Sequence, residues 1–228
     1  MKRITFIIAA LAVAASMQGQ EKKWSLDYEV GLGMTKFFNY SALSLQEDNT
    51  ASYTAPTASF TFGLRRDDGF SFGLRYSNTA VNTSNVAMQE HATLHDFSLV
   101  VRRSAMLSQR VELYGSATLG FAILHNSLVY NGDNLSANRY GYSAGLEAGL
   151  RYYFSSEAYF FVSAGLSAVN LTNVKKLPSP QTQNGLAASH LTGGFGIGFR
   201  PKVKKLNMPA EVIDRKEPLQ MAWYGEGR

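Results

Sequence analysis

A strict alternation of residue types over residues 140–168 constrains the fold of this chain more than any other feature. Every second residue from Tyr140 to Phe154 is apolar or aromatic, and the residues between them are mostly small, polar or charged. After a turn at 155–157, the pattern returns from Phe160 to Ala168. Successive side chains of a strand point to opposite faces, so the pattern predicts a β-hairpin. One apolar face, one polar face and aromatic residues at the ends are typical of a hairpin that meets lipid on one side.

The first twenty residues have the composition of a secretory signal peptide. Lys2 and Arg3 precede an apolar run, Ile4 to Ala15, that is too short to cross a membrane as a helix. Small residues near its end allow three cleavage positions: after Ala14, after Ser16 or nearer Gln20. We therefore expect the mature chain to begin at about residue 21 and to act outside the cytoplasm.

Composition excludes several classes of protein. The chain has 22 basic and 17 acidic side chains, and losing Lys2 and Arg3 leaves 20 against 17, which is not the balance of a nucleic-acid-binding protein. With no cysteine, it has no disulfide, no thiolate metal site and no site for cysteine lipidation. Past the signal peptide, no apolar stretch approaches the eighteen or so residues of a transmembrane helix. A membrane protein of this kind must be a closed barrel.

The alternation recurs along the chain and gives eight predicted strands, near residues 24–37, 58–65, 70–77, 91–103, 111–123, 140–154, 160–168 and 191–199. Leu94 breaks the pattern of the fourth strand, which suggests a bulge there. Long polar connections at 38–52, 78–89, 125–138 and 170–185 alternate with short turns at 66–69, 104–108 and 155–157. This ordering favours an all-β fold, an eight-stranded antiparallel up-and-down transmembrane β-barrel. The alternative is a soluble lipocalin-like barrel or sandwich, whose apolar side chains would point inward.

A short motif on the last strand sharpens the prediction. Residues 192–199 follow the order polar, any, Gly, any, any, apolar, any, aromatic, with the fixed positions filled by Thr192, Gly194, Ile197 and Phe199. With its eight predicted strands over residues 24–200, the chain resembles the outer-membrane barrel family that includes the transmembrane domain of OmpA and OmpX. The version it is most similar to is the small porin-family or PorT-like barrel of Bacteroidetes.

The resemblance carries expectations about location and partners. It implies the outer membrane of a Gram-negative bacterium, contact with outer-membrane lipid and lipopolysaccharide, and a last-strand motif that the barrel-assembly machinery reads. It also implies a division into a signal peptide (1–20), a barrel (21–200) and a short periplasmic tail (201–228), with both termini periplasmic. The tail extends 29 residues past Phe199, so the assembly signal would be internal. We expect a solvated periplasmic extension; the alternative is a peptide that docks on a periplasmic partner or returns to block the barrel mouth.

Ten charged residues fall on the inward parity of the predicted strands. Five are acidic and five are arginines: Asp27, Glu29, Asp96, Glu112, Glu147, Arg65, Arg75, Arg102, Arg151 and Arg200. An eight-stranded barrel is just wide enough for side chains to fill its interior, and buried charges are costly unless they are paired. We therefore expect an ion-pair network that plugs the lumen. A small or gated pore is the alternative.

Catalytic and metal sites have weaker support. His125 and Ser127 form a His-x-Ser at the outer end of the fifth strand, similar to the motif of the outer-membrane lipid A 3-O-deacylases, in which serine attacks an acyl ester with histidine as base. No carboxylate is clearly placed to orient the histidine. His91 and His95 make only a weak metal pair, and we expect no metal and no cofactor.

Aromatic residues cluster near the predicted strand ends, including Phe37, Tyr76, Tyr140, Tyr153 and Tyr159, and we interpret them as interfacial girdles. The sequence thus predicts a non-enzymatic outer-membrane barrel with a structural or interaction role. The small pore and the deacylase-like enzyme are the alternative functions.

Overall fold

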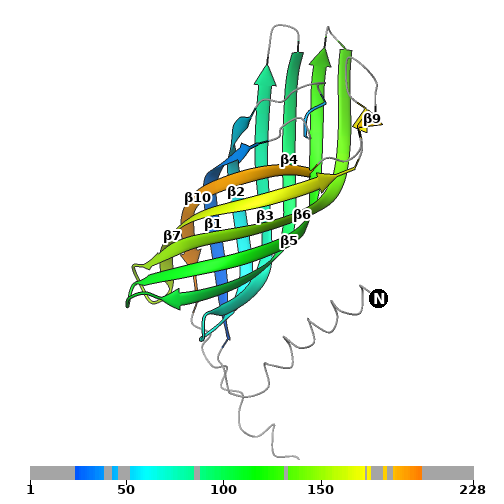
Figure 1. Ribbon diagram of the computed structural model, residues 1–228. Coiled ribbons are helices and arrows are strands. Elements are labelled where there is room, and N and C mark those ends of the chain that lie inside the picture. The colour runs from blue at the N-terminus through cyan, green and yellow to red at the C-terminus, as the bar shows by residue number, and fades with distance from the viewer. Residues whose placement is uncertain are drawn as a thin grey trace, which may run out of the picture.

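The chain forms a closed, antiparallel up-and-down β-barrel of eight strands (Figure 1). The structure is a computed structural model that describes residues 24–38, 43–45, 52–84, 88–130, 133–172, 174–175, 182–183 and 187–201. The barrel strands are β1 (Trp24–Phe37), β2 (Tyr53–Arg66), β3 (Phe70–Ser84), β4 (Met88–Met106), β5 (Val111–Tyr130), β6 (Asp133–Tyr153), β7 (Ala158–Leu171) and β10 (Ala187–Phe199). Two short strands, β8 (Val174–Lys175) and β9 (Thr182–Gln183), pair with each other outside the barrel. The predicted fold class is confirmed, while the signal peptide and the tail beyond Pro201 lie outside the described residues.

Pairing between the first and last barrel strands closes the cylinder. β1 pairs with β10 from Tyr28 opposite Phe199 to Phe37 opposite His190, and every other strand pairs with its neighbour in sequence. The short turn predicted at 66–69 joins β2 to β3 through Asp68-Gly69, and Gly69 has a φ of 87° that other residues rarely adopt. The three turns at 67–69, 107–110 and 154–157 lie at the same end as Trp24 and Phe199, which we call the short-turn end (Figure 1).

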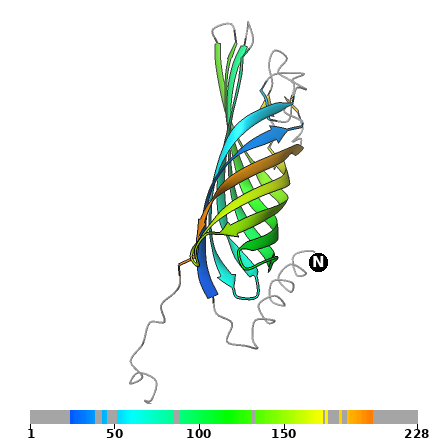
Figure 2. The same cartoon turned by 90° about the vertical axis from the view of Figure 1, so that its left-hand side faces the viewer.

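Two predicted loops are strands instead. Residues 78–84 and 88–89 belong to β3 and β4, and most of 125–138 belongs to β5 and β6, so these four strands have 15, 19, 20 and 21 residues, against 13 or 14 in the other four. They project beyond the barrel as a tall sheet (Figure 2). The alternation does not stop where the sequence becomes polar; it reverses phase. Apolar residues such as Val81 and Leu124 point inward there, together with a few buried polar residues such as Glu90, and most of the outward residues are polar.

The same reversal explains Leu94. This residue pairs in regular register with Thr79 and Leu124, so no bulge is present at this position. Its side chain is 5% exposed and packs inside the barrel with other apolar residues. The predicted bulge is therefore wrong, because Leu94 belongs to the inward apolar set of the tall sheet.

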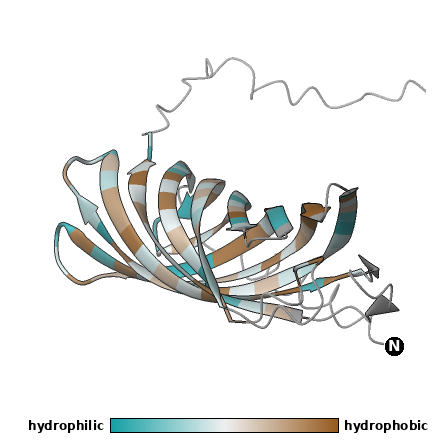
Figure 3. Cartoon of the chain, turned by 90° about the horizontal axis from the view of Figure 1, so that it is seen from above, coloured by the Kyte–Doolittle hydropathy of each residue, from teal (hydrophilic) through white to brown (hydrophobic). Residues whose placement is uncertain are grey.

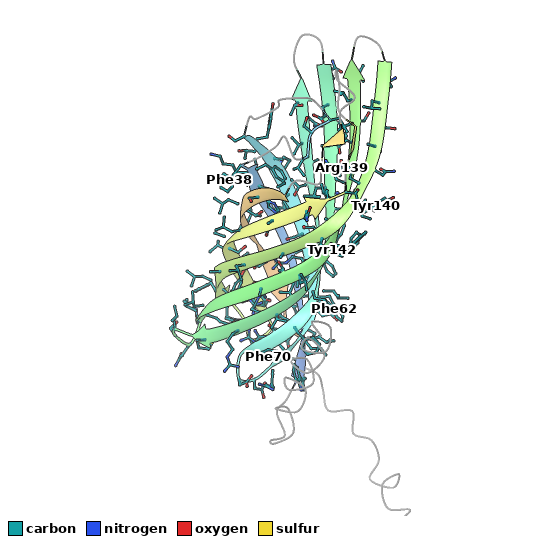
Figure 4. All side chains as sticks on the ribbon, turned by 45° about the vertical axis from the view of Figure 1, so that its right-hand side comes forward. Phe38, Phe62, Phe70, Arg139, Tyr140 and Tyr142 are labelled. Carbon is teal, nitrogen blue, oxygen red and sulfur yellow. The ribbon has the colours of Figure 1, made fainter. Side chains whose placement is uncertain are left out.

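The outer wall carries an apolar band between two sets of aromatic residues. Hydrophobic and hydrophilic residues alternate along the strands (Figure 3). Exposed aromatic residues near the short-turn end include Phe72, Tyr152, Phe154, Phe160 and Phe199. At the other end, Tyr76, Phe97, Phe121 and Tyr142 form one cross-strand row. Figure 4 shows Tyr140 and Tyr142 toward the tall sheet and Phe62 and Phe70 toward the short-turn end. Across the described stretches, no helix is long and apolar enough to cross a membrane.

Candidate functional site

Inward side chains fill the lumen in three layers. Charged residues lie nearest the short-turn end, hydroxyl-bearing residues follow, and apolar residues close the end below the tall sheet. We call the first layer the charge network. It consists of nine of the ten residues predicted for it: Asp27, Glu29, Arg65, Arg75, Arg102, Glu112, Glu147, Arg151 and Arg200.

Glu29 is the centre of the charge network. Arg102 donates two hydrogen bonds of 2.9 Å, one to each carboxylate oxygen of Glu29. Arg151 donates to Glu29 Oε1 through Nη2 at 2.6 Å and through Nε at 3.1 Å. Its Nη2 also lies 3.2 Å from a carboxylate oxygen of Asp27. Since Arg151 is 0% exposed, its positive charge is balanced by neighbouring carboxylates and not by solvent.

Two further groups complete the charge network. The fully buried Glu112 pairs with Arg65, lies 3.5 Å from Arg151 and 3.8 Å from Arg200, and accepts a hydrogen bond from the Tyr153 hydroxyl. Arg75 makes a two-pronged pair with Glu147, with both N–O distances at 2.9 Å. Arg102 lies 3.7 Å from the same Glu147 carboxylate, which joins this pair to the Glu29 centre. The arginine forks match carboxylates in geometry as well as in charge.

Asp96 stands apart from the other nine. It faces a cavity of about 100 Å³ between the charge network and the apolar layer. Among the described residues, none forms an ion pair with Asp96. Twelve of its lining residues are serines or threonines, and Thr192, Thr35, Thr57 and Thr79 link side chain to side chain along one wall at 2.9, 2.6 and 2.8 Å. Such a polar space suits ordered water.

Sequence reasoning misplaced three aromatic residues. We predicted Tyr153 and Tyr159 in an interfacial girdle, but both point into the lumen, and Tyr159 is fully buried and donates hydrogen bonds to Asp27 and Glu29. Phe37, also predicted in a girdle, is fully buried in the apolar layer. The alternation alone identified the correct face, because each of the three lies two positions along its strand from a residue predicted to point inward. Tyr114 also points into the lumen, where its ring lies 4.3 Å from the Arg102 guanidinium and 5.0 Å from that of Arg151.

The apolar layer is sealed by a short piece of the connection between β1 and β2. This piece, residues 43–45, is called the latch segment here, and the side chains of Leu43 and Leu45 are 1% and 0% exposed. Ser44 Oγ donates to Glu90 Oε2 at 2.6 Å, and the Leu45 amide donates to Glu90 Oε1 at 2.7 Å. Asn126 Nδ2 donates to the Leu43 carbonyl at 2.9 Å. The inner face of the tall sheet therefore holds the latch segment by buried hydrogen bonds.

Replacing Glu90 with alanine should loosen the latch segment. The change removes the two hydrogen bonds that Glu90 accepts from Ser44 Oγ and the Leu45 amide, and a hydrogen bond to a charged group contributes about 1.5–3 kcal/mol. We expect the Leu45 amide to exchange with deuterium at least tenfold faster, measured by mass spectrometry of the folded protein in detergent. Gln89→Ala is the control, because Gln89 is exposed on the opposite face of β4. Unchanged protection in Glu90→Ala would show that Glu90 does not hold the segment.

The His-x-Ser motif lies on the outer face of the tall sheet. His125 is exposed and its Nδ1 lies 2.6 Å from Asn138 Oδ1, while Ser127 is half-buried two residues further along the same strand. No carboxylate of the described chain contacts either side chain. Between them, Asn126 points to the opposite face, where it binds the latch segment. In the residues that the structure covers, no group of three or more histidine, aspartate or glutamate side chains could hold a metal ion.

The predicted assembly signal lies on β10, the closing strand. Ile197 and Phe199 point outward and are 54% and 47% exposed, with Phe199 at the short-turn end. Thr192 points inward and hydrogen-bonds to Thr35, and Gly194 also faces the lumen, where it lines the 100 Å³ cavity. The apolar and aromatic positions of the motif are therefore accessible from outside the barrel.

Comparison of the structure with solved structures decides the fold family. Neisserial surface protein A is 10% identical, with a TM-score of 0.51 over 79% of this chain and 99% of that one. The chain has the fold of the small outer-membrane β-barrels. Ail of Yersinia pestis is 14% identical, with a TM-score of 0.47, and the N-terminal barrel domain of Pseudomonas aeruginosa OprF is 19% identical, with a TM-score of 0.42. Each match covers 79% of this chain and all of the other chain. No protein-family model and no curated protein sequence matches the chain.

Proposed function

We propose that this chain is a non-enzymatic outer-membrane protein with a closed lumen, which contributes to envelope structure and interactions. The closure of the lumen at two levels supports this proposal best. The charge network fills one level with side chains that are at most 22% exposed, and the apolar layer with the latch segment fills another. A cavity of about 100 Å³ lies between them. Within the described residues, this arrangement supports a lumen that is closed to solutes.

The outer wall supports a position in the membrane. An apolar band flanked by aromatic residues is what lipid and its two interfaces require, and a closed barrel leaves no strand edge unpaired in lipid. We place the short-turn end in the periplasm and the tall sheet outside the cell. Contact with outer-membrane lipid, recognition of residues 192–199 by the barrel-assembly machinery, and contact of the tail with a periplasmic partner belong to the same proposal.

Conductance tests the closed lumen. The full mature chain, refolded in detergent and added to planar bilayers, should give no discrete current steps, because the charge network blocks the bore. A general porin added to the same bilayers is the positive control, and a boiling-dependent mobility shift on gels shows that the sample is folded. Reproducible current steps from the folded protein would favour the small-pore alternative and contradict the proposal.

A further inference from the structure

The outer face of the tall sheet presents a polar surface just beyond the aromatic row Tyr76, Phe97, Phe121 and Tyr142. Three cross-strand rows follow that row along β3, β4, β5 and β6. We call these rows the polar face; they consist of Asn78, His95, Ile123 and Tyr140, then Ala80, Thr93, His125 and Asn138, then Asn82, His91, Ser127 and Ser136. In the described parts of these stretches, every Asp, Glu, Lys and Arg whose side-chain placement is described faces inward. Apart from Ala80 and Ile123, the polar face is therefore built from amide, imidazole and hydroxyl side chains and carries no carboxylate, ammonium or guanidinium group.

A hollow of about 310 Å³ lies on the polar face at its third row. Five of its seven lining residues point outward: Asn82, Gln89, His91, Ser127 and Val129. The volume is at the lower end of the range for small-molecule sites, about 300–1,000 Å³. The hollow thus has the size and the hydrogen-bonding groups of a site for a small neutral polar ligand.

The side chains of the polar face are already oriented by one another. His91 Nδ1 pairs with Asn82 Oδ1, and its Nε2 lies 3.4 Å from Thr93 Oγ1. His95 Nδ1 lies 2.9 Å from the Tyr76 hydroxyl and 3.0 Å from Asn78 Nδ2. Such cross-strand bonds fix the rings, so little side-chain entropy remains to be lost on binding. Amides and hydroxyls both donate and accept, which matches the hydroxyl groups of a sugar.

Distance from the aromatic row indicates what surrounds the hollow. Three steps of two residues amount to roughly 20 Å along the strand. With the aromatic row at the lipid interface, the hollow lies past the lipid headgroups, at the height of the sugars carried by outer-leaflet lipids. We propose that the polar face binds neutral sugar units of the lipopolysaccharide core, with the third-row hollow as the main subsite. This inference rests on the proposed location and orientation of the barrel.

The test uses the full mature protein in detergent and, as probe, dephosphorylated core oligosaccharide released from lipopolysaccharide. The double variant Asn82→Ala/His91→Ala removes a bonded pair together, so neither partner is left unsatisfied. We expect its affinity for the oligosaccharide, measured by calorimetry, to fall at least tenfold. The control, Gln109→Ala/Ser156→Ala, changes two exposed side chains at the short-turn end and should bind like wild type.

Two results with the oligosaccharide would each overturn the inference: no binding by wild type, or equal affinity in wild type and the polar-face variant. Lipid A without sugars beyond its own disaccharide should bind wild type and the polar-face variant with equal affinity. A lower affinity of the variant for this lipid A would mean that the surface binds the lipid, and the inference would be wrong. Fractionation separates this outcome from failure of the proposed function. A protein that is absent from the outer membrane fails the proposed function, whereas one that is present there and ignores the oligosaccharide fails only the inference.

Discussion

Replacing Glu29 with alanine should lower the free energy of unfolding by about 3–5 kcal/mol, the usual cost of removing one partner from a buried ion pair. Arg102 and Arg151 both use Glu29 as their nearest acceptor, and both are almost wholly buried. The variant leaves two arginines short of an acceptor in the lumen. Urea titration of the protein folded into lipid vesicles, followed by tryptophan fluorescence, measures the change.

Asp67→Ala is the matched control for Glu29→Ala. Asp67 is an exposed carboxylate in the turn after β2, and surface changes of this kind stay within about 0.5 kcal/mol. Adding Arg102→Met to Glu29→Ala should recover part of the loss, because one uncompensated charge is then removed. A loss below 1 kcal/mol in Glu29→Ala would mean that the charge network contributes little to stability.

Gly198→Ala is expected to destabilise the barrel by about 1–3 kcal/mol or more through overpacking. A methyl group on Gly198 would overlap the ring of Tyr159. That ring cannot move aside easily, since it is fully buried and its hydroxyl is bonded to Asp27 and Glu29. The urea midpoint should fall, and less of the protein should show the boiling-dependent mobility shift.

Gly193→Ala supplies the same substitution on the same strand without the clash. Gly193 points outward, and an added methyl group would meet nothing within 4 Å. Both glycines occupy unspecified positions of the 192–199 motif, so the assembly motif alone predicts no effect from either. Equal stability of the two variants would contradict the packing argument for Gly198.

Residue alternation predicted much of the fold, because the side-chain period of a strand is two and lipid makes one face uniformly apolar. The bounds of β1 and the inward position of all ten charged residues could be read this way. The tall sheet could not, since its two faces exchange polarity once the outer face leaves the apolar band. Leu94 and Leu124 are inward for the same reason that Leu99 and Leu119 are outward: each avoids water.

The partners inside the lumen were harder to predict than the faces. Parity shows that Glu29 points inward, but only register and barrel closure bring it to Arg102, 73 residues away. The latch segment depends on a contact between Glu90 and the connection after β1, for which the sequence shows no periodic signal. Tyr159 was misread because a tyrosine near a strand end fits a girdle as well as a lumen, and its depth decides between them.

The charge network has a mechanical consequence. Eight of its members come from β1, β2, β3, β4, β5 and β6, and the ninth, Arg200, directly follows β10; Tyr159 adds β7. Ion pairs therefore connect opposite walls of the cylinder across its centre in several directions. Flattening the cylinder would stretch at least one charged pair in the largely buried interior, where separating opposite charges is costly. Under lateral pressure from the membrane, the part of the barrel at the short-turn end should resist compression more strongly than an empty barrel of the same size.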